Sequence, residues 1–232
     1  MMKRNQSGFT LIEMAIVLVI IGLLLGGVLK GQELINSAKV KNIATDFKNI
    51  PVYIYGYQDK FRALPGDDKA ADTHVGGIVC TTTTGTCSTG DGVINGAWNA
   101  DQANASTTES VLFWQHVRLA GLATGSTTPA APDYLPVNAS GGTIGIMSGT
   151  TVLTSAAIND GTNAIRGSYV ICSTGILGKF VKQLDLQMDD GNTAGGSMMA
   201  TPTVGYTLGT SSVAKANNDI NDADSYIVCM GV

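Results

Sequence analysis

The carboxylates nearest the C terminus are the residues best suited to bind a metal ion. Asp189 and Asp190 are adjacent, and Asp219 and Asp222 follow in a second acidic segment. Carboxylate oxygens are hard ligands that suit calcium. None of the acidic segments reproduces the EF-hand loop, because GDGVING (90–96) lacks the earlier acidic positions and the terminal glutamate. We therefore expect either a structural calcium at these four aspartates or solvated Asx turns, and no other cofactor.

Four cysteines could form two disulfides. They show no C-x-x-C spacing and stand apart from the histidines in sequence, which argues against zinc. Cys172 in SYVIC and Cys229 in SYIVC have matching strand-like contexts, so we expect them to pair across neighbouring strands. Cys80 and Cys87 then bracket the threonine-rich stretch TTTTGT (81–86), and we expect them to close it. Other pairings stay open from the sequence alone.

The sequence carries no catalytic signature. It contains no G-x-S-x-G, no P-loop and no Cys/His pair with a geometric role, so no catalytic residue and no enzymatic activity are expected. His116 lies near Trp114 in a predicted helix and is expected to be a packed or surface side chain. The formal net charge is -4, which argues against nucleic-acid binding by bulk electrostatics, because such binding needs clustered Lys and Arg.

The N-terminal segment decides the class of protein. Lys3 and Arg4 precede an apolar run from Phe9 to Leu29 that is interrupted by one charge, Glu13. As a helix this run would be about 30 Å long, enough to cross the hydrocarbon core of a membrane. The two cations should stay on the cytoplasmic side, so the rest of the chain is expected to be exported.

Two alternatives compete with a membrane helix of special function. A secretory signal peptide also has a basic start and an apolar core, but this run is longer than usual and lacks an A-x-A-like site, Gly26-Gly27 being the closest match. An ordinary signal anchor is harder to separate by physics alone. Glu13 separates them, because a carboxylate one turn into a membrane helix costs a few kcal/mol unless it finds a partner.

The residues from Gly8 to Glu13 spell GFTLIE, which resembles the class III signal of type IV pilins and type II secretion pseudopilins. The resemblance implies that prepilin peptidase cuts between Gly8 and Phe9 and that Phe9 is then N-methylated. It also implies that Glu13 guides the docking of subunits. A new α-amine on a neighbouring Phe9 could neutralise Glu13 in an apolar filament core.

The segment after the membrane run has the pattern of an amphipathic helix. Apolar residues recur at steps of three and four from Ile43 to Leu64, and Pro51 inside this stretch predicts a bend. Beyond it, short β-branched runs separated by glycines predict an antiparallel sheet of about four to six strands, and a further helix is expected at residues 109–123. QLDLQMDDGNTAGG (183–196) is interpreted mainly as turns and packing.

These observations predict an α+β, pilin-like fold, in which a long N-terminal helix packs on a C-terminal antiparallel β-sheet. We expect a prepilin leader (1–8), a transmembrane or filament-core half of the helix (9–31), an amphipathic half (32–64) and a globular body (65–232).

The resemblance implies a structural subunit of a type IV pilus or pilus-like filament. Its partners would be copies of itself in a helical filament, other pilins, prepilin peptidase and the inner membrane before assembly. The body would be extracytoplasmic at first and extracellular in the filament. A type II secretion pseudopilin and a minor tip pilin acting as a binding or adhesion module are the alternatives, and the large body, threonine-rich loop and two expected disulfides favour a pilin.

Overall fold

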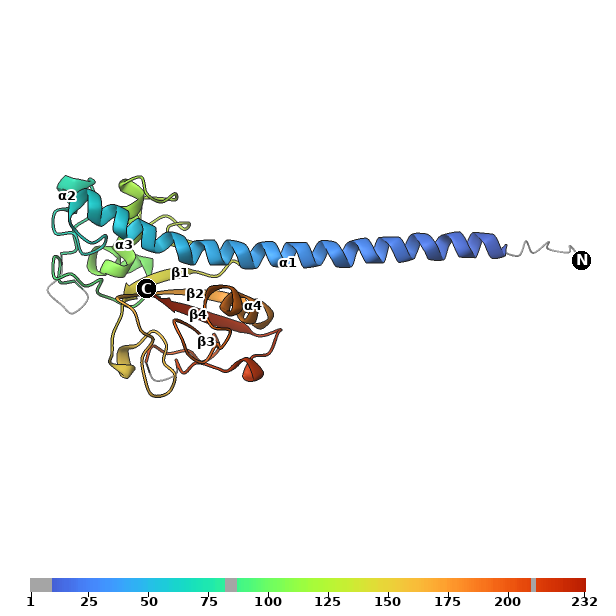
Figure 1. Ribbon diagram of the computed structural model, residues 1–232. Coiled ribbons are helices and arrows are strands. Elements are labelled where there is room, and N and C mark those ends of the chain that lie inside the picture. The colour runs from blue at the N-terminus through green and yellow to red at the C-terminus, as the bar shows by residue number, and fades with distance from the viewer. Residues whose placement is uncertain (1–9, 82–86, 210–211) are drawn as a thin grey trace, which may run out of the picture. The chain divides into compact units, whose positions relative to one another are not determined.

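The computed structural model describes residues 10–81, 87–209 and 212–232. These residues belong to two units, with the boundary between Lys39 and Val40. The first helix, α1 (Leu11–Phe61), begins in the first unit and ends in the second. Figure 1 shows its course together with the strands and helices of the second unit.

The part of α1 that lies in the second unit buries the predicted apolar stripe. Its buried side chains recur every three or four residues, as the sequence predicts: Val40, Ile43, Ala44, Phe47, Ile50, Ile54 and Tyr57. The helix continues through Pro51 and ends at Phe61, three residues before the predicted end at Leu64. Arg62 ends it, because this residue has a left-handed backbone (φ 56°) and donates its N–H to the carbonyl oxygen of Gln58 at 2.9 Å.

A four-stranded antiparallel sheet forms the centre of the second unit, in the order β1-β2-β4-β3. Its strands are β1 (Ile144–Ser148), β2 (Tyr169–Leu177), β3 (Met198–Pro202) and β4 (Ser225–Gly231). The predicted α+β class and strand number are confirmed. Three strands fall in the β-branched runs that the sequence singles out, whereas β3 was not predicted.

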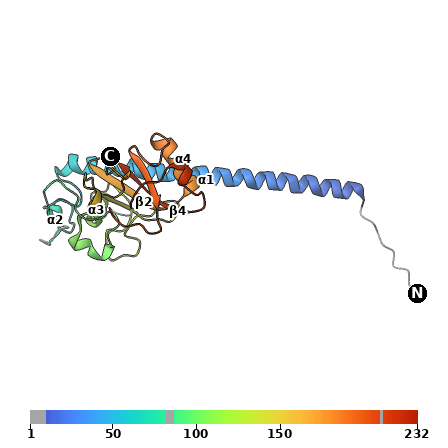
Figure 2. The same cartoon turned by 90° about the horizontal axis from the view of Figure 1, so that it is seen from below.

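Both faces of the sheet are buried, and neighbouring residues on a strand belong to different cores. Ile171 and Met230 pack with the stripe of α1 in the larger hydrophobic cluster. Cys172 and Cys229 lie in the smaller cluster with Ile158, on the opposite face. Figures 1 and 2 show residues 40–61 of α1 running alongside the sheet, in agreement with their shared core.

Two further helices frame the sheet. α3 (Glu109–Leu119) contacts β1 and stops before the predicted end at residue 123, because Ala120 ends the helix and Gly121 takes a left-handed backbone (φ 76°). α4 (Gly178–Met188) follows β2 directly and contacts β2, β3 and β4. The interpretation of residues 183–196 as turns is therefore wrong for residues 183–188. The short elements are α2 (Ala71–His74), η1 (Gln102–Thr107), η2 (Leu153–Ser155) and η3 (Asn217–Asp219).

Candidate functional site

The first unit presents an apolar helical surface in which every described residue from 10 to 30 is exposed. By length and composition alone, α1 is long and apolar enough to cross a membrane. Fourteen of its large hydrophobic side chains are exposed in this part: Leu11, Ile12, Met14, Ile16, Val17, Leu18, Val19, Ile20, Ile21, Leu23, Leu24, Leu25, Val28 and Leu29. Gly8 and Phe9, the expected processing residues, lie outside the described residues.

Glu13 takes part in a capping box at the start of α1. Its Oε2 atom accepts the backbone N–H of Thr10 at 2.8 Å and the Thr10 hydroxyl at 2.7 Å. The Thr10 oxygen in turn accepts the N–H of Glu13 at 3.4 Å. The motif T-x-x-E thus satisfies donors that a helix start leaves free. Glu13 therefore has a local role in the single chain as well as the docking role that the resemblance implies.

The four glycines of the apolar segment have no packing partner within the described chain. A Cβ atom added at Gly22, Gly26, Gly27 or Gly31 would meet nothing within 4 Å apart from the backbone of the helix itself. Their small size is therefore not required by contacts within the described chain. Close approach of another helix remains an explanation for the two small-xxx-small pairs.

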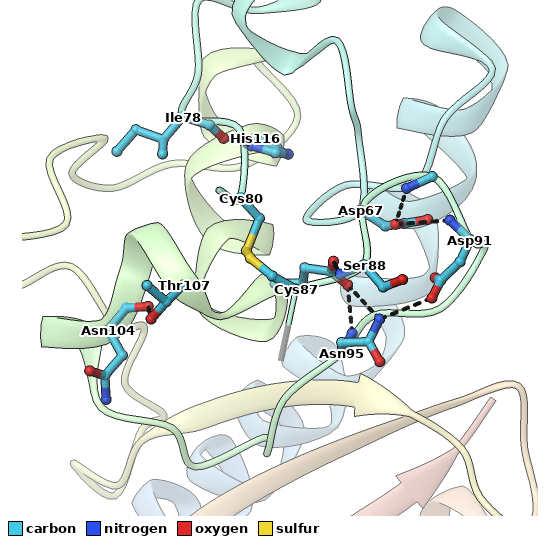
Figure 3. Close-up of a disulfide and its surroundings, with 12 residues drawn as sticks. Asp67, Ile78, Cys80, Cys87, Ser88, Asp91, Asn95, Asn104, Thr107 and His116 are labelled. Carbon is cyan, nitrogen blue, oxygen red and sulfur yellow. Dashed lines mark hydrogen bonds between the residues drawn. A yellow bond between two sulfur atoms is a disulfide. The ribbon is translucent and has the colours of Figure 1, made fainter. Parts of the chain in front are cut away.

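Two buried carboxylates hold together the loops that precede α3. Asp67 accepts the backbone N–H groups of Gly90, Asp91 and Gly92, the last at 2.8 Å. Glu109 accepts the N–H of Ser88 at 2.7 Å. Burial raises the pKa of both carboxyls, and these hydrogen bonds oppose the rise. Figure 3 shows the loops around Asp67 beside the Cys80–Cys87 disulfide.

Asp68 is the centre of a second buried network. It accepts the Tyr57 hydroxyl at 2.8 Å, the N–H of Ala70 at 2.9 Å and contacts His74 Nδ1 at 2.7 Å. Burial acts to raise the pKa of Asp68, but the hydrogen bonds from His74, Ala70 and Tyr57 hold it below the usual value. A cleft of about 830 Å³ opens beside this network, with Arg62 among its lining residues. Because the carboxylate is already committed to structural bonds, it is not placed as a free base.

His116 bridges two segments and is fully buried. Its Nδ1 atom accepts the N–H of Gly66 at 2.9 Å, and its Nε2 atom lies 2.8 Å from the carbonyl oxygen of Ile78. This pattern fits the neutral ring with the proton on Nε2. Burial lowers the pKa of His116. The residue is packed, one of the two states expected from the sequence, and it has a structural role.

The structure places the four expected calcium ligands in different surroundings. Asp189 and Asp190 lie together with Asp185, a residue that the sequence analysis missed. Asp222 instead forms an ion pair with Lys182 at 2.9 Å. Asp219 lies at the end of η3 and is absent from the acidic clusters found among the described residues. The predicted four-residue set is therefore not the set that the fold brings together.

The cysteines form both pairs that the sequence favours. Cys172 and Cys229 are register partners on β2 and β4, and their sulfurs are bonded. Cys80 and Cys87 are also bonded and close the loop that contains the threonine-rich stretch, of which residues 82–86 lie outside the described part. Glu109 lies near their sulfurs, but two sulfurs bonded to each other are not available as thiolate ligands.

Comparison with known proteins adds one finding. Residues 3–29 match the family model described as the prokaryotic N-terminal methylation motif. No curated protein and no solved structure matches the chain significantly. The matched residues include GFTLIE, and they are consistent with the resemblance to type IV pilins and pseudopilins.

Proposed function

We propose that this protein, which carries the prokaryotic N-terminal methylation motif, is a structural subunit of a type IV pilus or pilus-like filament. In this proposal the chain is inserted in the inner membrane and cut between Gly8 and Phe9. Phe9 is then methylated, and the subunits polymerise through α1. The observation that carries the proposal is the exposed apolar segment of α1 directly after the processing motif.

Burial of this segment is the driving force that the proposal invokes. A helix that is apolar on all sides needs an apolar surrounding, either lipid or other helices. Burying one large aliphatic side chain is worth about 1.5–3 kcal/mol, so the fourteen exposed side chains represent tens of kcal/mol in total. Lipid supplies this surrounding before assembly, and neighbouring copies of α1 supply it in the filament.

Glu13 gives the assembly its register. The Thr10 hydrogen bonds satisfy part of the carboxylate but bring no positive charge. A buried carboxylate without a counter-charge is costly. The protonated α-amine of a neighbouring processed Phe9 would supply that charge at one position along the helix. Subunits would therefore dock at one axial offset, instead of sliding along an otherwise uniform apolar surface.

The first experiment is mass spectrometry of filaments sheared from cells that produce the native chain. The expected result is an abundant subunit that begins with N-methylated Phe9. An uncut leader that retains Lys3 to Gly8 would refute the proposal. Processed protein that stays in the membrane, with loss of secretion on gene deletion, would favour the pseudopilin alternative.

A matched pair of variants tests the role of Glu13. Glu13→Gln should be inserted and cut normally but should reduce filament yield by about tenfold or more, because the register charge is lost. Glu33→Gln is the control, since Glu33 is an exposed residue of the same helix that pairs with Lys30. Equal filament yields from the two variants would show that Glu13 does not guide docking.

A further inference from the structure

Asp185 is an unusual carboxylate within the second unit. It lies on α4, is 1% exposed, and neither of its oxygens has a hydrogen-bond partner among the described residues. A buried carboxylate without partners is strongly disfavoured, so its persistence in a fold requires a compensating group. The other buried carboxylates of this unit that we describe, Asp67, Asp68 and Glu109, all accept hydrogen bonds.

The neighbours of Asp185 increase the need for compensation. Asp189 and Asp190 approach it from the end of α4 and the residue after it, so three carboxylates converge. None of the three takes part in the ion pairs found in the described part of the chain. Burial raises the pKa of Asp185 to about 6, and the charges of Asp189 and Asp190 contribute, whereas the backbone N–H of Gly191 only partly opposes the rise.

From this convergence we infer that Asp185, Asp189 and Asp190 form a binding site for a calcium ion. One oxygen from each residue can be chosen so that the three lie within 4.8 Å of one another. A single ion with metal–oxygen distances of about 2.4 Å could therefore contact all three. The ion would give the two oxygens of Asp185 the partner that the described protein groups do not supply.

The loop after α4 holds the other two carboxylates in place. Asp189 accepts the backbone N–H groups of Ser197 and Met198 at 2.7 and 2.9 Å, and Asp190 accepts the N–H of Asn192 at 2.8 Å. These bonds use some of the lone pairs and orient the carboxylates, while each oxygen can accept more than one contact. Gly196 lets the loop pass close by, because a Cβ there would overlap the Asp189 carboxylate.

Calcium fits this donor set better than zinc or magnesium. All three donors are carboxylates, whereas zinc in proteins is usually held with histidine or cysteine. Magnesium requires a tight octahedron at about 2.0–2.1 Å and retains much of its water, while calcium accepts irregular sets of protein oxygens and water. Asp190 is exposed, so water could complete the shell. The competing explanation is a proton shared between Asp185 and a neighbouring carboxylate.

The test is calorimetric titration of calcium chloride into the full chain in detergent, after metal has been removed with a chelator. We expect one calcium per chain and a rise in the unfolding temperature on binding. Asp185→Asn should weaken binding at least about tenfold, because it removes one ligand charge from the site. Asp222→Asn is the matched control, since Asp222 is exposed and pairs with Lys182 outside the cluster.

The outcomes separate the two explanations. If Asp185→Asn folds poorly, Asp190→Asn tests the same site from its exposed side and should also weaken binding. Absence of saturable binding up to about 10 mM calcium, beyond the range of weak extracellular calcium modules, would overturn the site. Equal affinity in the wild type and both cluster variants would also overturn it. A metal-free gain in stability for Asp185→Asn without calcium binding would support the shared proton instead.

Discussion

The Nδ1 atom of His116 accepts a hydrogen bond from the backbone N–H of Gly66 at 2.9 Å, although 50 residues separate the two in sequence. The opposite ring nitrogen lies 2.8 Å from the carbonyl oxygen of Ile78. One side chain of α3 thus joins the segment after α1 to the segment before the Cys80–Cys87 loop, as Figure 3 shows for His116 and Ile78. The neutral ring serves as acceptor and donor at once, and protonation would remove the acceptor.

The first prediction is that the second unit becomes less stable in acid because of His116. Burial lowers the pKa of His116 below its usual value of 6.5, so the unfolded chain binds a proton at a higher pH than the folded chain does. The contribution of His116 is therefore fully present above about pH 6.5 and is lost as the pH falls through that value towards the lower folded pKa.

The variant His116→Gln isolates this effect, because it cannot titrate. At pH 8 it should be less stable by about 1–3 kcal/mol, since the N–H of Gly66 loses its acceptor. The difference from the wild type should shrink between pH 7.5 and pH 5. Urea unfolding followed by circular dichroism at several pH values measures it, and a difference that is constant with pH would contradict the prediction.

The second prediction concerns the two disulfides. The Cys172–Cys229 bond spans 57 residues and the Cys80–Cys87 bond spans seven. Loop-closure entropy then gives about 4 kcal/mol for the long loop and about 2.5 kcal/mol for the short one. Replacing each pair by alanine and measuring urea unfolding without reductant should give the larger loss for Cys172 and Cys229. An equal or reversed order would show that effects other than chain entropy dominate.

How far the sequence predicts the fold depends on how local the signal is. The stripe of α1 is visible because Ile43, Phe47 and Ile50 follow the helical period, and the register of Cys172 with Cys229 agrees with their matching strand contexts. Strand β3 was missed because MMATP contains few β-branched residues and ends in Pro202.

The acidic cluster shows where sequence reasoning goes wrong. Asp185 and Asp189 are four residues apart, which places them on one face if a helix continues to Met188. Because the segment was interpreted as turns, this i, i+4 signal was not used, and Asp219 and Asp222 were chosen instead. No local pattern indicates that Asp185 is buried by the sheet, because its burial depends on the packing of α4 against three strands.

The third prediction concerns the hydroxyl of Tyr206 in the smaller core. It accepts the indole N–H of Trp98 at 2.8 Å and donates to the carbonyl oxygen of Ala157 at 2.7 Å, joining three segments that are far apart in sequence. Tyr206→Phe keeps the ring but leaves the Trp98 donor and the Ala157 acceptor without this partner. The free energy of unfolding should fall by about 1–3 kcal/mol.

Tyr55→Phe is the matched control for this change, because it removes the same hydroxyl from a ring that is 62% exposed on α1. Its free energy of unfolding should stay within about 0.5 kcal/mol of the wild type. Urea unfolding of both variants, followed by tryptophan fluorescence, makes the comparison. If Tyr206→Phe were as stable as Tyr55→Phe, water would be satisfying Trp98 and Ala157, and the three segments would not depend on the Tyr206 hydroxyl for their stability.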